Sequence, residues 1–354
     1  MSLERVLSHF TEQAGLCTAY GSPFTGALIE AMADDVEVGG PVASLVADWP
    51  TNPTVDALAL RLTGALHAAV LTGRDPALAA LYPNRDPAWS VAKMWPAARA
   101  FFEREGGHVA RFIQSAPQTN ETRRSIALLS AFLAFAEHWH GPIDLLELGA
   151  SAGLNLNWDR FAYRTQSWAW GDGAVRIDTD WYGAPPPTQA HPRVRHRAAC
   201  DLNPLDIRDA EQRLRLKSYI WPDQPERLAR FDAAAALAVE ADARVDRASA
   251  DLWLTEKLAA RAGDAATIVY HSVFLQYPPK DVRSAIIAAI QDAGATATAN
   301  APLAWVRMEP EAVTDGVHNG LRFVIDLITW PGGERRILGY TDGHVRAIYA
   351  EPPR

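Results

Sequence analysis

The sequence predicts an α/β fold in which a mostly parallel sheet follows an all-helical N-terminal domain. Residues 1–140 carry apolar side chains at three- and four-residue spacing, as helices do. From residue 143 onward, short apolar runs alternate with helical stretches. A glycine turn at 331–334 then joins two late apolar runs as an antiparallel hairpin. We therefore expect a helical domain at 1–140 and a sheet domain at 141–354.

Within the helical domain, prolines mark the expected helix starts. Asn52 stands directly before Pro53, which predicts an N-cap followed by proline at the first helical position. The same signal recurs at Asp75 and Asp86, each followed by proline. Pro96 lies inside an otherwise helical stretch and predicts a kink or a division of that helix.

The sheet domain contains a regular alternation of expected strands and helices, interrupted once. The interruption is an aromatic-rich and proline-rich insertion at 161–191, which we expect to be a hairpin excursion. Expected strands lie at 143–148, 194–200, 244–248, 267–271, 303–308, 321–330, 335–340 and 345–349, and expected helices at 224–239, 253–261 and 279–293.

Composition and charge exclude several classes of protein. The 354 residues are 48% hydrophobic and 21% charged, as in a folded globular protein. The formal net charge is −8, which disfavours a nucleic-acid partner. The two cysteines have no metal-ligand spacing, so no metal site is predicted. The chain shows neither a secretory segment nor an apolar run long enough to span a membrane, so we expect a cytoplasmic protein without a membrane partner.

The most informative motif is the turn that follows the first expected strand. Glu147 stands near the strand end, and Gly149 and Gly153 frame a small-residue turn into an expected helix. Such glycines let the backbone approach a ligand, and the helix start offers free amides. Ser151 occupies the position of the second glycine of a dinucleotide motif, and no phosphate-loop lysine follows. NAD and ATP are therefore disfavoured, although a tight turn without any ligand is the plain alternative.

This segment resembles motif I of the class I S-adenosylmethionine-dependent methyltransferases, which are Rossmann-like enzymes. The resemblance implies a carboxylate at the end of the second strand that binds the ribose, and Asp201 matches it. It also implies a third-strand segment near the adenine, matched around Asp251, and a last strand inserted antiparallel. The insertion at 161–191 makes the spacing from Gly153 to Asp201 longer than in an ordinary strand, helix, strand unit. The implied cofactor is S-adenosylmethionine, and its expected contacts are Glu147, Gly149, Ala150, Ser151, Gly153, Asn155, Asp201, Leu202, Asp251 and Ser272.

Along nearly its whole length the chain is also similar to an uncharacterised bacterial family, domain-of-unknown-function family 2332. The matching segments are 118–121, 147–155, 221–223 and 271–272. This likeness identifies relatives and implies no chemistry.

Two residues after the fourth expected strand are candidates for catalysis. His271 lies at the carboxyl end of a central strand, where ligands bind in open α/β sheets, and its imidazole titrates near neutrality. It is a candidate base, with Tyr277 nearby to present the acceptor. Alternatively, His271 is a core group and the transfer needs only alignment. A Ser272 and His271 hydrolase pair is disfavoured, because adjacent strand residues face opposite sides.

Other polar residues are candidates for the acceptor pocket. Asn120, Glu121 and Arg124 precede the first strand, whereas Arg307 and Glu309 end the fifth. Helix capping by Asn120 and an ordinary ion pair of Arg307 are the alternatives, and Asp201 could equally cap a turn. We thus expect a methyltransferase acting on a small-molecule acceptor. The alternatives are a non-catalytic S-adenosylmethionine or nucleoside-binding module, and a Rossmann-like enzyme of another reaction type. The sequence leaves the oligomeric state open.

Overall fold

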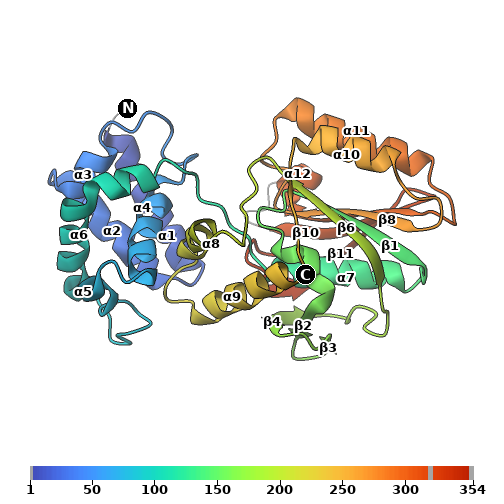
Figure 1. Ribbon diagram of the computed structural model, residues 1–354, viewed down its shortest axis with the longest axis horizontal. Coiled ribbons are helices and arrows are strands. Elements are labelled where there is room, and N and C mark those ends of the chain that lie inside the picture. Colours follow the sequence, from blue (N-terminus) through green and yellow to red (C-terminus); the bar gives the residue numbers. More distant parts are fainter. Residues whose placement is uncertain (1–2, 318–321, 351–354) are drawn as a thin grey trace. The chain divides into compact units, whose positions relative to one another are not determined.

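The computed structural model describes residues 3–317 and 322–350 (Figure 1). The chain forms two compact units. The first unit comprises Met1–Thr119 and Arg208–Phe231, and the second comprises Asn120–Ile207 and Asp232–Arg354. The division thus falls earlier than residue 140, and a later segment of the chain returns to the first unit. None of the helices in the described ranges is long and apolar enough to cross a membrane.

The first unit is entirely helical, as its apolar spacing predicts. Its helices are α1 (Leu3–Ala19), α2 (Pro23–Glu37), α3 (Pro41–Val46), α4 (Leu58–Leu71), α5 (Pro76–Ala79), α6 (Val91–Phe112) and α8 (Ala210–Ser218). They enclose an apolar core to which Phe10, Phe24, Leu62 and Phe101 contribute fully buried side chains. α8 joins this unit from a later part of the sequence, after the segment Asn120–Ile207 of the second unit.

Three of the expected proline signals have a different outcome in the structure, whereas Asp75 caps α5 as predicted. Asp86 starts no helix, because its carboxylate accepts from the Ala88 amide in a turn and α6 begins only at Val91. The side chain of Asn52 accepts hydrogen bonds from the amides of Thr54 and Val55, which makes a turn, and α4 begins only at Leu58. Pro96 is accommodated within α6, whose irregular backbone lies at Glu105 instead. Pro96 is the sixth residue of α6, beyond its first turn, so it removes the hydrogen bond that an amide there would make to the Ala92 carbonyl, and the helix continues past it.

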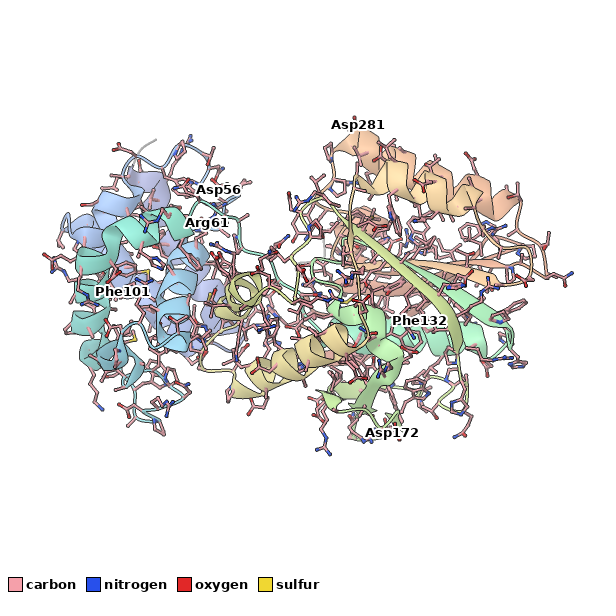
Figure 2. The ribbon with its side chains drawn as sticks, in the orientation of Figure 1. Asp56, Arg61, Phe101, Phe132, Asp172 and Asp281 are labelled. Carbon is pink, nitrogen blue, oxygen red and sulfur yellow. The ribbon has the colours of Figure 1, made fainter. Side chains whose placement is uncertain are left out.

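Buried Arg61 fixes the irregular entry into α4. Its Nε donates to the Asp56 carbonyl at 2.6 Å, and one Nη donates to the Ile113 carbonyl at 2.8 Å, at the end of α6. The guanidinium also lies 3.5 Å from the Asp56 carboxylate (Figure 2). One charged side chain therefore satisfies the carbonyls of two segments that lie far apart in the sequence.

The second unit is built on a nine-stranded mixed sheet. Its strands are β1 (Pro142–Leu148), β5 (Asp180–Tyr182), β6 (Arg193–Asp201), β7 (Asp246–Arg247), β8 (Ala266–Ser272), β9 (Leu303–Pro310), β10 (Phe323–Trp330), β11 (Glu334–Thr341) and β12 (Ala347–Tyr349). The order is β5-β12-β11-β10-β9-β8-β1-β6-β7. From β7 to β9 all neighbours are parallel, whereas β9 to β12 pair antiparallel. The predicted α/β class and terminal antiparallel hairpin are confirmed.

The end of the sheet differs from what the methyltransferase resemblance implies. That resemblance calls for a last strand inserted into the sheet. Here β10 lies directly beside β9, and β11 and β12 follow outside it in chain order. The late strands are therefore appended as a meander. Residue 321, the expected start of β10, lies outside the described residues.

The insertion at 161–191 is more than a hairpin. It forms a separate sheet in the order β3-β2-β4, from β2 (Phe161–Arg164), β3 (Ala169–Trp170) and β4 (Val175–Asp178). β2 and β3 make the expected antiparallel hairpin, while β4 pairs parallel to β2. β5 then leaves the insertion and pairs with β12 at the edge of the large sheet.

Helices cover both faces of the large sheet (Figure 1). They are α7 (Arg124–Ala136), α10 (Ala250–Ala259), α11 (Lys280–Ala295) and the short α12 (Glu311–Thr314), whereas α9 (Pro225–Glu240) crosses the division of the chain. Val269 of β8 packs in the core that includes α10 and α11, and Phe132 of α7 meets Tyr270 on the opposite face with ring centroids 5.2 Å apart. Alternate residues of β8 therefore face different helices.

Candidate functional site

The glycine turn that follows β1 has the backbone that its sequence requires. Gly149 and Gly153 have φ of +68° and +72°, a region that favours glycine. Ser151 also has a positive φ, +55°, which costs free energy in a residue with a side chain. The amides of Gly149 and Ala150 both donate to the Cys200 carbonyl, at 2.9 and 3.1 Å. The turn is therefore held against the end of β6.

Asp201 binds this turn from the end of β6. One carboxylate oxygen accepts from the Ser151 amide at 2.9 Å, and the other accepts from the Asn203 amide at 2.8 Å. The capping alternative for Asp201 thus describes its present contacts. Each carboxylate oxygen can still accept a further hydrogen bond, so the same side chain can also face a ligand hydroxyl. The next residue, Leu202, is exposed.

The helix expected after the turn is a seven-residue 3-10 helix, η1 (Leu154–Arg160). Its first amides are already used. The Leu154 amide donates to the side chain of Asn120 at 3.1 Å, and the Leu156 amide donates to the Gly153 carbonyl at 3.2 Å. Two of the amides that the sequence predicts to be free at this helix start are therefore engaged within the chain.

Two buried side-chain oxygens of the turn lack partners. Neither Ser151 Oγ nor Asn155 Oδ1 has a hydrogen-bond partner among the residues that the structure describes. The amide nitrogen of the Asn155 side chain does have a partner, because Nδ2 donates to the Glu121 carbonyl at 3.3 Å. A buried polar atom without a partner costs about 1 to 3 kcal/mol. Two such atoms on one turn indicate a place where a polar ligand would be stabilised.

Glu147 lies under the turn in an almost fully buried position. Tyr270 of β8 donates its hydroxyl hydrogen bond to Glu147 Oε2 at 3.0 Å. Burial raises the pKa of the Glu147 carboxyl to about 8, the Tyr270 hydrogen bond opposes that rise, and the charge of Asp201 adds to it. The carboxyl is therefore mostly neutral at pH 7. Tyr270 was missed from the sequence, where it stands beside His271 but faces the opposite side of the sheet.

The loop after β8, the strand next to β1, packs against the turn. Val273 has a φ of +54°, which is unusual for a β-branched residue. Phe274 follows it and packs on Gly149, and its amide donates to Glu309 Oε1 at 2.8 Å. β1 is the point where the sheet reverses order, with β6 on one side and β8 on the other. Open α/β sheets bind ligands at such a point, beyond the carboxyl ends of the strands.

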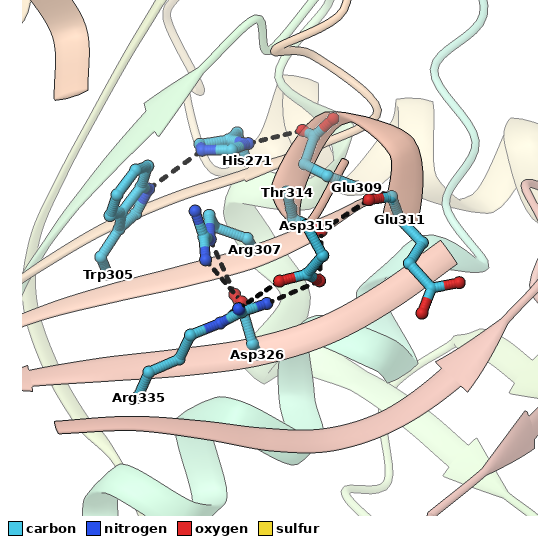
Figure 3. A network of polar contacts seen from close by, with 9 residues as sticks. All are labelled: His271, Trp305, Arg307, Glu309, Glu311, Thr314, Asp315, Asp326 and Arg335. Carbon is cyan, nitrogen blue, oxygen red and sulfur yellow. Dashed lines mark hydrogen bonds and ion pairs between the residues drawn. The ribbon is translucent and has the colours of Figure 1, made fainter. Parts of the chain in front are cut away.

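His271 belongs to a buried chain of hydrogen bonds (Figure 3). Trp305 Nε1 donates to His271 Nε2 at 3.0 Å, and His271 Nδ1 lies 2.6 Å from Glu309 Oε1. Because the indole nitrogen can only donate, Nε2 accepts, and the ring proton on Nδ1 is donated to Glu309. Both imidazole nitrogens are thus engaged, and the side chain is fully buried. Glu309 Oε2 has no partner in the described part of the chain.

Arg307 is also held inside the sheet. It makes two hydrogen bonds to the carboxylate of Asp326 on β10, at 2.8 and 2.5 Å. Arg335 of β11 donates to the same carboxylate at 2.6 Å and also pairs with Asp315 (Figure 3). The ion-pair alternative for Arg307 therefore describes its contacts, and this guanidinium is only 8% exposed.

The other expected site residues lie at the edge of the turn or away from it. Glu121 accepts from the Arg123 amide and lies 3.9 Å from His344, and Arg124 donates to the Gly343 carbonyl, so both contact the loop between β11 and β12. Asp251 accepts a hydrogen bond from Ser249 at the start of α10. Ser272 is partly buried, whereas Tyr277 is 73% exposed.

These features define an α/β protein with a positive-φ glycine turn at the carboxyl edge of its central strands. The model of a bacterial family described as "Uncharacterized protein conserved in bacteria (DUF2332)" matches residues 8–349, and the chain belongs to that family. A search of curated proteins found no match. Among the described residues, no group of three or more His, Cys, Asp or Glu side chains could hold a metal ion.

Proposed function

We propose that this protein is an S-adenosylmethionine-dependent methyltransferase that acts on a small-molecule acceptor. The observation that carries the proposal is the positive-φ turn at 149–153 with its unpartnered Ser151 and Asn155 oxygens. The turn stands where the strand order β7-β6-β1-β8-β9 reverses. That combination favours a polar ligand with an extended body lying across the strand ends.

The residues around the turn suit a nucleoside bearing an amino acid. The Ser151 and Asn155 oxygens accept hydrogen bonds, as an ammonium or hydroxyl donor requires. Asp201 is placed to add a ribose contact to its two amide bonds, and Leu202 and Asp251 follow the ends of the neighbouring strands β6 and β7. When bound, S-adenosylmethionine supplies an electrophilic methyl group on a sulfonium.

Within this proposal, the protein contributes alignment and the exclusion of water. Both nitrogens of His271 are engaged by Trp305 and Glu309, so His271 acts as a positioning residue that holds Glu309 and, through it, the amide of Phe274. Methyl transfer to an acceptor nucleophile needs a straight approach in a dry site more than it needs a base. Asn120, Glu121 and Arg124 would shape the acceptor side, and the exposed Tyr277 would contribute a hydroxyl from the loop after β8.

A non-catalytic module that binds S-adenosylmethionine or another nucleoside is the second candidate. The engaged imidazole of His271 favours it, because both of its nitrogens already have partners among the described residues. A Rossmann-like enzyme of another reaction type is the third. The three differ in donor binding and in turnover, so two measurements separate them.

The first measurement is calorimetric titration of the full chain with S-adenosylmethionine and S-adenosylhomocysteine. We expect saturable binding that Gly149→Arg abolishes. Gly316→Arg is the matched control, because Gly316 has the same φ of +68° and a Cβ built on it meets no atom of the described residues within 4 Å. Failure of the folded wild-type protein to bind either compound would refute the proposal. If binding is present, methyl transfer from labelled donor to a panel of small acceptors distinguishes the enzyme from the binding module.

A further inference from the structure

The helical unit contains a pocket of its own. It has a volume of about 750 Å³ and is lined by residues of α4, α6 and α8 and by the segment that follows α4. All of its lining belongs to the first compact unit. Its ligand is therefore independent of the methyl donor proposed for the sheet unit.

The pocket gathers basic side chains from three separate segments. Arg74 follows α4, His108 and Arg111 lie in the last turns of α6, and Arg215 lies in α8. The one carboxylate of the lining belongs to Glu211. This local excess of positive charge stands in a chain whose formal net charge is −8.

The three arginines differ in how far they are already satisfied. Arg74 lies 3.2 Å from the carboxylate of Glu105. Arg215 donates to the Phe112 carbonyl at 3.2 Å and stacks on the Phe112 ring, with its guanidinium carbon 4.4 Å from the ring centroid. Arg111 makes no ion pair or side-chain hydrogen bond within the described ranges. It therefore presents a guanidinium with its donors free, the geometry that oxyanions bind.

The charges of the three arginines converge on His108. The pKa of His108 is lowered first by partial burial and then by the nearby charges of Arg74, Arg111 and Arg215, against which Glu105 works in the opposite direction. Three guanidinium groups thus raise the electrostatic potential around one imidazole. An anion at that point would be attracted by all three.

The rest of the lining is apolar. Ala68 and Ala69 of α4, Phe112 of α6 and Leu214 of α8 supply small or flat surfaces. Phe112 already carries the guanidinium of Arg215 on one face. A pocket with an apolar lining and a few convergent polar groups is typical of sites for small organic molecules.

We propose that this pocket binds a small organic oxyanion, a phosphate or carboxylate carried on a compact apolar body. The anionic group lies against Arg111 and Arg74, with Arg215 beside it. The apolar body packs on Ala68, Ala69 and Leu214. Phosphate and carboxylate share this recognition, since both accept paired hydrogen bonds from a guanidinium.

The test is calorimetric titration of the full chain with phenyl phosphate, benzoate and the neutral analogue phenol. We expect at least one of the two anions to bind more tightly than phenol. The anion that binds more tightly shows whether the pocket prefers a phosphate or a carboxylate. Arg111→Gln should weaken that anion about tenfold, as loss of one charge-assisted contact does. Arg85→Gln is the matched control, because Arg85 is an exposed arginine of the same unit outside the pocket lining and should leave affinity unchanged.

Two results would overturn this assignment. One is equal affinity for phenol and for both anions, or no binding of any of them. The other is anion binding that Arg111→Gln leaves as tight as Arg85→Gln does. Circular dichroism and the unfolding midpoint of each variant establish that it is folded, and both arginines are exposed, so neither substitution should disturb the helical core.

Discussion

The ring of Phe274 lies directly over Gly149, so that a Cβ built on the glycine would stand 2.4 Å from Phe274 Cδ2. The two residues follow β1 and β8, the adjacent strands at which the sheet order reverses. The backbone of Phe274 is held by Glu309, whose carboxylate accepts a hydrogen bond from the Phe274 amide. The candidate site is therefore bounded by a close contact that only glycine permits.

This contact predicts the cost of a single added methyl group. Gly149→Ala combines a left-handed backbone with overlap on the Phe274 ring, and we expect a loss of about 2 to 5 kcal/mol in the free energy of unfolding. Gly316→Ala has the same φ but its Cβ meets none of the residues that the structure describes within 4 Å, so it should lose only about 1 to 2 kcal/mol. Denaturant unfolding measures both variants. Equal losses would show that Phe274 moves aside freely.

Glu147 predicts a pH dependence of stability. The pKa of its carboxyl is raised by burial from 4.5 to about 8, so the folded state holds a proton that the unfolded chain releases. Stability from this group is full below about pH 4.5 and is lost as the pH rises toward 8. Glu147→Gln keeps an acceptor for Tyr270 and cannot ionise. We expect it to match the wild type near pH 5 and to exceed it at pH 9 by a few kcal/mol.

Unfolding curves in urea at pH 5, 7 and 9 test this expectation. Glu256→Gln is the control, because Glu256 is exposed on α10 and its substitution should leave the pH profile unchanged. A Glu147→Gln profile parallel to that of the wild type would contradict a buried, neutral carboxyl.

The hydrogen-bond chain through His271 predicts a structural role for that residue. His271→Phe leaves the indole N–H of Trp305 without an acceptor and Glu309 without its imidazole donor. Each unmet buried group costs about 1 to 3 kcal/mol, so a loss of several kcal/mol in unfolding free energy is expected. His138→Phe, at an exposed histidine, should change stability little. Similar small effects of both substitutions would argue against this chain of bonds.

Asp326 predicts that losing a buried carboxylate lowers the free energy of unfolding more than losing an exposed one. It accepts hydrogen bonds from Arg307 and Arg335 and is fully buried, so Asp326→Asn leaves Arg307 with an uncompensated buried charge. We expect a loss of about 3 to 5 kcal/mol. Asp342→Asn breaks the exposed pair with Arg346 and should cost at most about 1 kcal/mol. Thermal or denaturant unfolding of the two variants gives the comparison, and a loss as small for Asp326→Asn as for Asp342→Asn would contradict it.

The central strands β1, β8 and β9 could be predicted from the sequence because they are rich in apolar residues and mostly buried on both faces. The expected strand at 267–271 and the observed β8 differ by one residue at each end. α8 was missed because charged side chains dominate its sequence and little of it is buried. In the insertion only a hairpin was predicted, and β4 was missed because a strand of four residues leaves little pattern in the sequence.

The candidate site was predictable only in part. Gly149 and Gly153 mark the turn, because a positive φ leaves a signature in the sequence. The partners of its polar groups leave none. Tyr270 lies opposite Glu147 on the adjacent strand, and Asn120 accepts from the first amide of η1, so both contacts depend on the register and packing of the sheet. Which polar atoms of the site have partners could therefore be learned only from the three-dimensional structure.

The unpartnered oxygen of Ser151 predicts opposite effects on stability and on binding. Ser151→Ala removes a buried hydroxyl that has no partner in the described part of the chain, so the free energy of unfolding should stay the same or rise by about 1 kcal/mol. Ser125→Ala is the matched control at a second buried serine. Its hydroxyl donates to the Thr122 carbonyl at 2.6 Å, so the substitution should cost about 1 kcal/mol.

If the Ser151 hydroxyl serves a ligand, the same substitution must weaken binding. We expect Ser151→Ala to lower the affinity for S-adenosylhomocysteine about five- to tenfold, the effect of one hydrogen bond, whereas Ser125→Ala leaves it unchanged. Calorimetric titration and urea unfolding of the same preparations measure both properties. A variant that loses stability without losing affinity would show that Ser151 serves the fold of the turn. A variant that loses affinity while keeping its stability would assign the hydroxyl to the ligand.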